Sequence, residues 1–129
     1  MSGLLLDSHV LYNFALGKPQ IGPETLNLLN SAQRLMFSSM TVLELNIKHL
    51  LGKFEDIEPL VSAIKQNGII ELPLGSDAVF RLKDFPQLSN HDPFDRTILA
   101  QAMELGVPLV TADRRLVSLG LEWVKDARK

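Results

Sequence analysis

Short runs of apolar residues alternate along this chain with longer stretches in which apolar residues recur every three or four positions. The runs are typical of strands buried on both faces, and the spaced stretches are typical of helices with one buried face. The runs predict strands at residues 4–6, 34–38, 69–72, 109–111 and 121–124. The stretches predict helices at residues 8–14, 23–32, 42–51, 56–66, 76–83 and 93–105. This alternation favours one three-layer α/β domain over residues 1–129, with a parallel sheet between helices.

Local signals set several boundaries of these elements. Asp92 can cap the helix that begins at Pro93, and Gly106 suits the residue just past its end. Ser76 is the predicted cap of the helix at 76–83, and residues 84–90 form a polar connection. Apolar residues at helical spacing predict buried faces, and these residues include Leu26, Leu29, Phe94, Ile98, Leu99, Ala102 and Met103.

Composition narrows the class of protein. The 129 residues include no cysteine, which excludes disulfides and thiolate metal sites and fits a reducing cytoplasm. We find no apolar run long enough to span a membrane and no signal peptide at the N-terminus. The net charge of −2 gives no general affinity for nucleic acids. A polyanionic substrate would therefore need a local basic patch or a bridging metal ion.

Four acids are predicted at one edge of the sheet. Asp7 ends the first strand, Glu44 opens the helix after the second, Asp95 opens the helix before the fourth, and Asp113 follows the fourth. Right-handed crossovers bring these positions together. Carboxylates that close repel one another unless a cation neutralises them, and oxygen ligands without cysteine select Mg²⁺ or Mn²⁺. Such ions can activate water for phosphodiester hydrolysis.

Each of these residues also has a purely structural interpretation. Thr41 with Glu44, and Asp92 with Asp95, have the spacing of capping boxes. Asp7 and Asp113 could be loop acids that bond to backbone N–H groups. The histidines, His9, His49 and His91, lack a ligand spacing such as H-x-x-x-H and are interpreted as structural or surface residues.

Three segments carry a resemblance to a known family. They are LLLDSHVLYNF at 4–14, SSMTVLELNIKHLLGK at 38–53 and HDPFDRTILAQAMELGVPLVTADRRL at 91–116. Together, and in this order, they resemble a PIN-domain ribonuclease of the VapC toxin type over nearly the whole chain. The resemblance implies a sheet of strand order 3-2-1-4-5, an RNA substrate, a Mg²⁺ or Mn²⁺ cofactor, a homodimer and inhibition by a cognate VapB-like antitoxin.

Carried over by position, Asp7, Glu44, Asp95 and Asp113 fall on the family's metal-binding and catalytic acids. Possible additional site residues are Asp92, Ser8 and Thr111. The chain departs from this branch at two positions: Leu43 stands where Trp is frequent, and Ser8 where Thr is frequent. The basic residues expected to contact RNA are Lys48, Arg96, Arg114 and Arg115.

Two alternatives remain open at this point. A phosphoacceptor receiver-like signalling domain has a similar size and layering, but it needs an acidic pair after the first strand, where this chain has Asp7 followed by Ser8 and His9. A catalytically silent PIN scaffold would keep the fold without the chemistry. Labelling by acetyl phosphate would identify the receiver, and metal-dependent RNA cleavage would identify the nuclease.

Overall fold

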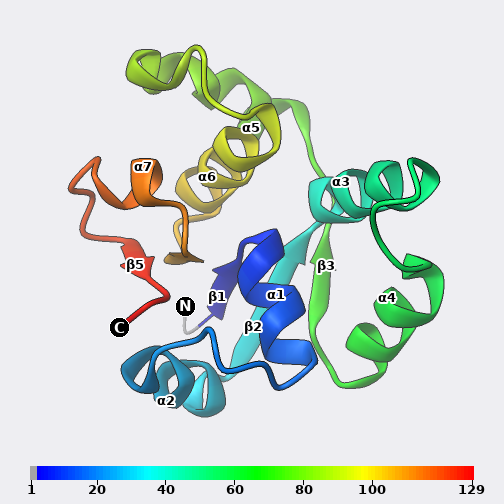
Figure 1. Cartoon of the computed structure of the whole chain (residues 1–129). Coiled ribbons are helices and arrows are strands. Elements are labelled where there is room, and N and C mark those ends of the chain that lie inside the picture. The colour runs from blue at the N-terminus through cyan, green and yellow to red at the C-terminus, as the bar shows by residue number, and fades with distance from the viewer. Residues whose placement is uncertain (1–2) are drawn as a thin grey trace.

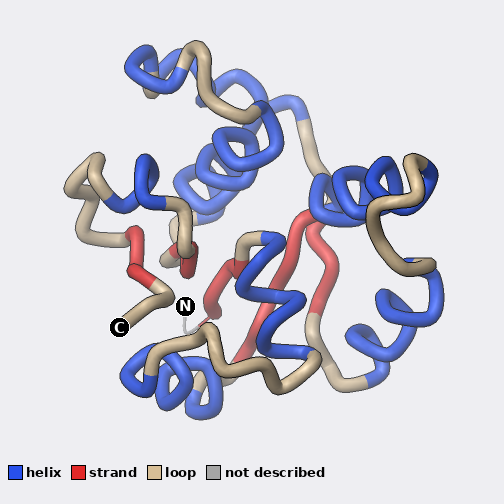
Figure 2. Tube along the Cα trace, viewed as in Figure 1, coloured by secondary structure: helices blue, strands red, loops and turns tan. Residues whose placement is uncertain are grey.

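A parallel sheet of five strands forms the centre of the protein, in a computed structural model that describes residues 3–129 (Figures 1 and 2). Its strand order is β3-β2-β1-β4-β5, which confirms the predicted order 3-2-1-4-5. All neighbouring strands run parallel. The strands are β1 (Gly3–Leu6), β2 (Arg34–Ser38), β3 (Ile70–Leu72), β4 (Leu109–Thr111) and β5 (Val124–Asp126). This order differs from the 2-1-3-4-5 order of receiver domains, so that alternative is excluded.

Helices connect the strands and cover the sheet. The α-helices are α1 (Ser8–Ala15), α2 (Pro23–Ser31), α3 (Ser39–Leu50), α4 (Ile57–Gln66), α5 (Ser76–Phe80), α6 (Pro93–Leu105) and α7 (Arg114–Val117). Two 3₁₀ helices, Arg81–Asp84 and Pro86–Leu88, join α5 to α6. In the described part of the chain, no helix combines the length and the apolar character needed to cross a membrane.

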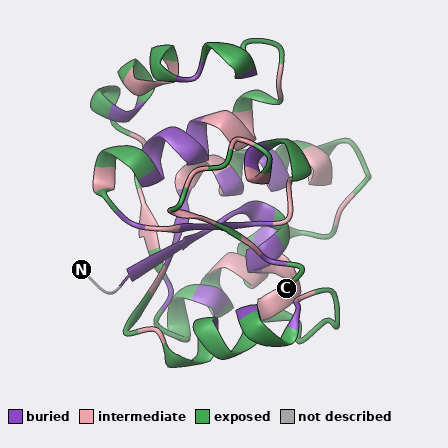
Figure 3. Cartoon of the chain, turned by 90° about the vertical axis from the view of Figure 1, so that its left-hand side faces the viewer, coloured by how far each residue is buried: buried purple, intermediate pink, exposed green. Residues whose placement is uncertain are grey.

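Alternating side chains on the strands feed two separate cores. Leu4 and Leu6 of β1 point to one face and pack with helices α1, α2 and α4, whereas Leu5 points to the other face and packs with α6 and α7. Figure 3 shows the resulting buried strands between partly exposed helices. The central strand is thus buried on both sides, as its uniformly apolar sequence predicts.

Helix α3 begins earlier than predicted. Ser38 caps it by accepting a hydrogen bond from Met40 N at 3.0 Å, so the helix starts at Ser39 rather than Val42. The predicted capping box of Thr41 and Glu44 is therefore wrong. Both residues lie inside the helix, and both are buried against the rest of the protein. This placement frees the Glu44 side chain for contacts outside its own helix.

The segment between α5 and α6 also differs from its prediction. Residues 84–90 are not simply a polar connection, because Phe85 and Leu88 are buried in the core shared with α6. Gly75, not Ser76, is the N-cap of α5, and the helix ends at Phe80. The last strand lies at Val124–Asp126 rather than at 121–124, because Leu109 of β4 pairs with Val124.

Two residues predicted to be buried are instead exposed. Leu26 of α2 is 41% exposed and Met103 of α6 is 40% exposed. On α2 the buried positions are Thr25 and Leu29, which lie about one turn apart, and Leu26 lies about 100° around the helix from Thr25. The apolar spacing was therefore correct in period but displaced in phase on this short helix.

Candidate functional site

The ends of β1 and β4 place two acids at the same edge of the sheet. Leu6 of β1 pairs with Val110 of β4, so Asp7 and Thr111 follow side by side. Asp113 comes two residues after Thr111, at the start of α7. Because parallel strands present their carboxyl ends at one edge, this is where a ligand site is expected in such a sheet.

Asp7 is buried and held from several sides. Its Oδ1 accepts a hydrogen bond from Val10 N at 2.8 Å and so caps α1. Its Oδ2 accepts from the hydroxyl of Thr111 and from Ala112 N. The same Thr111 oxygen accepts from Asp113 N at 3.0 Å. Thr111 therefore links the two acids, and its place among the additional site residues stays a prediction.

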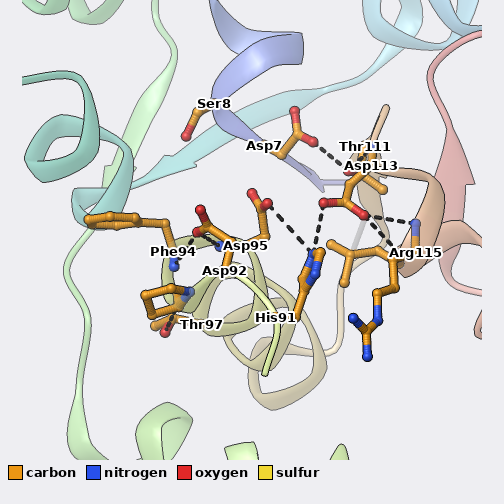
Figure 4. Close-up of polar contacts among 12 residues, drawn as sticks. Asp7, Ser8, His91, Asp92, Phe94, Asp95, Thr97, Thr111, Asp113 and Arg115 are labelled. Atoms are coloured by element: carbon orange, nitrogen blue, oxygen red, sulfur yellow. Dashed lines mark hydrogen bonds and ion pairs between the residues drawn. The ribbon is translucent and has the colours of Figure 1, made fainter. Parts of the chain in front are cut away.

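Asp113 divides its two oxygens between a cap and a histidine. Oδ1 accepts from Arg115 N and Leu116 N and caps α7, a one-turn helix where the sequence predicted a loop. Oδ2 lies 2.9 Å from Nε2 of His91. Figure 4 shows the His91 ring between Asp113 and Asp95. His91 Nε2 lies 3.8 Å from Oδ2 of Asp95.

The two acids that open α6 have different tasks. Asp92 is exposed and caps the helix, because its Oδ1 accepts from Phe94 N at 2.8 Å and from Asp95 N at 3.2 Å. The prediction that Asp92 caps this helix is confirmed. Asp95 faces the interior of the site, toward His91 and Asp113 (Figure 4). Pro93 and the Asp92 cap therefore fix the helix start that aims Asp95.

Three of the predicted acids line one small pocket. Its volume is about 210 Å³, and its lining residues are Asp7, His9, Asp95, Ala112 and Asp113. Ligand atoms of His91, Asp95 and Asp113 lie within 4.8 Å of one another, close enough to share one metal ion. The structure thus brings Asp7, Asp95 and Asp113 together, as the strand and helix positions predict.

The crowding of these carboxylates changes their acidity. Burial raises the pKa of Asp95 to about 8, and a hydrogen bond with the Asp113 carboxyl group and the charge of Asp92 act in the same direction. Burial also raises the pKa of Asp7. For Asp113, burial acts upward, but the Leu116 N–H, Asp95 and His91 together lower its pKa. The site therefore holds a proton where a cation would relieve the same repulsion.

Glu44 has hydrogen-bonding and ionic partners of its own. Within residues 3–129 it is absent from the lining of the acidic pocket. Its Oε1 accepts from the Ser8 hydroxyl at 2.8 Å, and its Oε2 pairs with Lys48 at 3.3 Å. The Ser8 oxygen also lies 2.9 Å from Thr41 Oγ1. Ser8, which directly follows Asp7 in the chain, therefore holds the Glu44 carboxylate by a hydrogen bond.

Two of the predicted RNA-contacting residues make backbone contacts instead. Arg96 donates from Nη1 to Ser89 O at 3.2 Å, and Arg115 donates from Nη2 to Gln87 O at 2.8 Å. Both contacts hold the segment that precedes α6. Lys48 pairs with Glu44, and Arg114 is exposed at the start of α7. An RNA contact remains a prediction for all of these residues.

His91 is the residue that the sequence interpretation missed. A search for two histidines at ligand spacing fails to find it, because its partner is an acid. The signal that could have found it was His91 with Asp95, four residues apart at the start of a helix, where i and i+4 side chains are neighbours. His49, by contrast, contacts Phe54 O through Nδ1 at 3.1 Å, as expected of a structural histidine.

Comparison with known proteins assigns this architecture to a group. The family model of the PIN domain matches residues 4–120. Similar solved structures include a toxin–antitoxin complex from Klebsiella pneumoniae (17% identity, TM-score 0.65, 94% of each chain covered). A second is the structure of VapBC2 from Rickettsia felis bound to a promoter DNA fragment (15% identity, TM-score 0.65, 95% of this chain and 96% of that chain covered). A third is the structure of DNA-bound VapBC from Salmonella typhimurium (21% identity, TM-score 0.60, 98% of this chain and 97% of that chain covered). No protein with a curated description matches significantly.

Proposed function

The chain belongs to the PIN domain family, and from this premise we propose that it is a metal-dependent endoribonuclease that acts as the toxin of a VapBC-type pair. The observation that carries the proposal is the convergence of Asp7, Asp95 and Asp113 on one pocket at the carboxyl edge of the sheet. The likeness to toxin–antitoxin structures supports the choice of this branch.

The donor set of the pocket fits a hard divalent cation. It offers carboxylate oxygens, and burial, helped by the neighbouring acids, raises the pKa of Asp95, so that a bound cation would favour its ionised form. Asp95 and Asp113 would hold Mg²⁺ or Mn²⁺, with Asp7 and Glu44 completing the acidic surroundings. A bound ion of this kind lowers the pKa of its water and offsets the charge of a phosphodiester.

The protein's own residues would supply position and polarity. Thr111 fixes the Asp7 carboxylate by hydrogen bonding, so this oxygen keeps one orientation at the edge of the site. The Asp113 oxygen that caps α7 anchors that side chain, which leaves the other oxygen directed to the pocket. Lys48, which is half-buried, and Arg114, which is exposed, would attract the RNA backbone.

The test is cleavage of a mixed single-stranded RNA pool by the purified chain. We expect cleavage with Mg²⁺ or Mn²⁺, none with EDTA, and a loss of at least about a hundredfold in Asp95→Asn, because the ion is no longer held in a fixed geometry. Asp77→Asn removes an exposed acid from α5 and is the matched control. A folded protein that leaves RNA intact with every divalent metal would contradict the proposal and favour the silent scaffold.

Partners follow from the same proposal. Expression of the chain alone should arrest growth, Asp7→Asn should not, and co-expression of a VapB-like antitoxin should restore growth. Equal arrest by the parent and by Asp7→Asn would show that the harm does not arise from the acidic site.

We also propose a homodimer, in which two basic surfaces face one RNA. A monomer mass measured by light scattering would contradict the dimer.

A further inference from the structure

The segment that carries His91 is built to deliver it to the acids. Leu88 is fully buried, and His91 N donates to Leu88 O at 2.9 Å. Arg96 and Arg115 hold the carbonyl groups of Ser89 and Gln87 from two sides. A surface histidine would need none of these anchors, and fixed supports of this kind are what a ligand site requires.

The side-chain atoms around the pocket differ in whether they already accept hydrogen bonds from the backbone and from Thr111. Both oxygens of Asp7 and one oxygen of Asp113 already accept hydrogen bonds from the protein. The remaining Asp113 oxygen faces His91 Nε2, with the Asp95 carboxylate opposite. Their side chains are 16–24% exposed, so an ion could reach them. The atoms that could bind an ion are therefore two carboxylate oxygens and one ring nitrogen, provided that the ion replaces the hydrogen bond between His91 and Asp113.

The spacing of this set is compatible with one ion. Ligands at right angles on an octahedral ion, with bonds of about 2.1 Å, are roughly 3 Å apart. His91 Nε2 and Asp113 Oδ2 are 2.9 Å apart, so an ion could replace their hydrogen bond with little movement of either atom. The ring would bind through the Nε2 lone pair, with its proton on Nδ1. Asp95 Oδ2 is 3.8 Å from Nε2 and would have to approach it by about 0.8 Å to occupy a neighbouring ligand position.

We propose that His91 is a nitrogen ligand of the ion held by Asp95 and Asp113, which makes this site select a first-row transition metal such as Mn²⁺ over Mg²⁺. The assignment rests on the proposed function and deepens it. Imidazole nitrogen binds transition metals well, whereas Mg²⁺ demands oxygen ligands. A cluster of carboxylates alone would not discriminate in this way.

The decisive readout is the environment of a bound Mn²⁺ ion. Electron spin echo spectroscopy of the EDTA-treated, Mn²⁺-loaded chain should show coupling to an imidazole nitrogen. His91→Gln should abolish this coupling. His9→Gln, which changes the other histidine near the pocket, should retain it, as should His49→Gln. Circular dichroism of the metal-free variants checks folding, and if His91→Gln fails to fold, the spectra of the parent and His9→Gln decide.

Calorimetric titration tests the selectivity. The parent should bind Mn²⁺ at least about tenfold more tightly than Mg²⁺, and His91→Gln should lose about 10–100-fold in Mn²⁺ affinity with less than about threefold change for Mg²⁺. Bound Mn²⁺ without a nitrogen coupling, or unchanged affinity in His91→Gln, would overturn the assignment. Such a protein could still cut RNA, which would leave the proposed function intact. Nitrogen-coupled Mn²⁺ without RNA cleavage would overturn the function alone, and a chain that binds neither ion would overturn both.

Discussion

Helices α3 and α6 each bring an acid to the carboxyl edge of the sheet, but they treat it differently. Glu44 on α3 has a hydroxyl partner in Ser8 and a cation partner in Lys48. Asp95 on α6 faces other carboxylates, and its pKa is raised to about 8. The Glu44 carboxylate is thus compensated by a hydroxyl group and a cation of the chain, whereas burial and the neighbouring carboxylates favour a bound proton on Asp95. Proximity to the edge alone does not distinguish them.

The two helices also differ in how much of their surface is buried in the core. Residues 97–102 of α6 are buried without interruption. Helix α3 buries Glu44 and Leu45 but leaves apolar side chains exposed, namely Leu43, Ile47 and Leu50. Helix α6 is therefore fixed by the core on most sides, which suits a helix that aims a ligand. Helix α3 is attached along a narrower stripe.

The largest effect should come from breaking the core under α6. Leu99 is fully buried, so Leu99→Ala should lower the free energy of unfolding by about 2–5 kcal/mol. The matched change on α3, Leu43→Ala, removes a side chain that is 48% exposed and should cost less than about 0.5 kcal/mol. Urea denaturation measures both. Similar losses in the two variants would show that α3 is packed as tightly as α6.

The next effect concerns the pH dependence of the metal-free protein. The pKa of Asp95 is about 8 in the folded chain, against an ordinary value of 3.8, so between these values the folded chain holds a proton that the unfolded chain has released. Raising the pH through this window therefore favours unfolding. With EDTA present, we expect the free energy of unfolding to fall between pH 4 and pH 8 by more than about 1.4 kcal/mol, the equivalent of one pKa unit.

Variants assign this pH dependence to one helix. Asp95→Asn should reduce the slope, and the remainder should come from Asp7, whose pKa burial also raises. Urea denaturation at a series of pH values measures these slopes. An Asp95→Asn protein with the parent's slope would place the uncompensated charge elsewhere.

The smallest effect is expected for the ion pair on α3. Lys48→Met should lower the free energy of unfolding by about 0.2–1 kcal/mol, because Lys48 is 41% exposed and Ser8 still donates to Glu44. Lys65→Met breaks a second surface pair, with Glu71, and is the control. Thermal unfolding of both variants at low and at high salt would measure how much each ion pair contributes to stability. A loss above about 3 kcal/mol would mean that Glu44 depends on Lys48 as a buried pair does.

Prediction from sequence succeeded where local chemistry and burial agree. Strands 34–38 and 109–111 have their predicted bounds, and Gly106 ends α6 with a φ of 74°, a conformation that favours glycine. It failed where a distant partner decides. The last strand is set by its pairing with β4, and the start of α3 was assigned to the wrong hydroxyl residue among several candidates. The cap that Asp113 provides to α7 was readable from sequence but was interpreted as a loop acid.

The candidate site follows the same division. The strand and helix positions were sufficient to place Asp7, Asp95 and Asp113 together, because parallel strands share one edge. They could not predict the partners of Glu44, because its contacts with Ser8 and Lys48 depend on side chains of α1 and α3. His91 was missed because the segment before α6 was taken as polar, although the spacing of Phe85 and Leu88 is that of two side chains on one face of a helical turn.

The pairing of β1 with β4 also determines when the acidic pocket can form during synthesis of the chain. Asp7 and its partner Thr111 are 104 residues apart in sequence, so this contact belongs to the slowest class to form in a folding chain. During translation Asp7 is made long before Asp95 and Asp113, because the chain grows from its N-terminus. A ribosome-bound fragment that stops before residue 113 contains only part of the acidic pocket. Whatever chemistry the pocket performs must therefore wait until residue 113 has been added and the contact between β1 and β4 has formed.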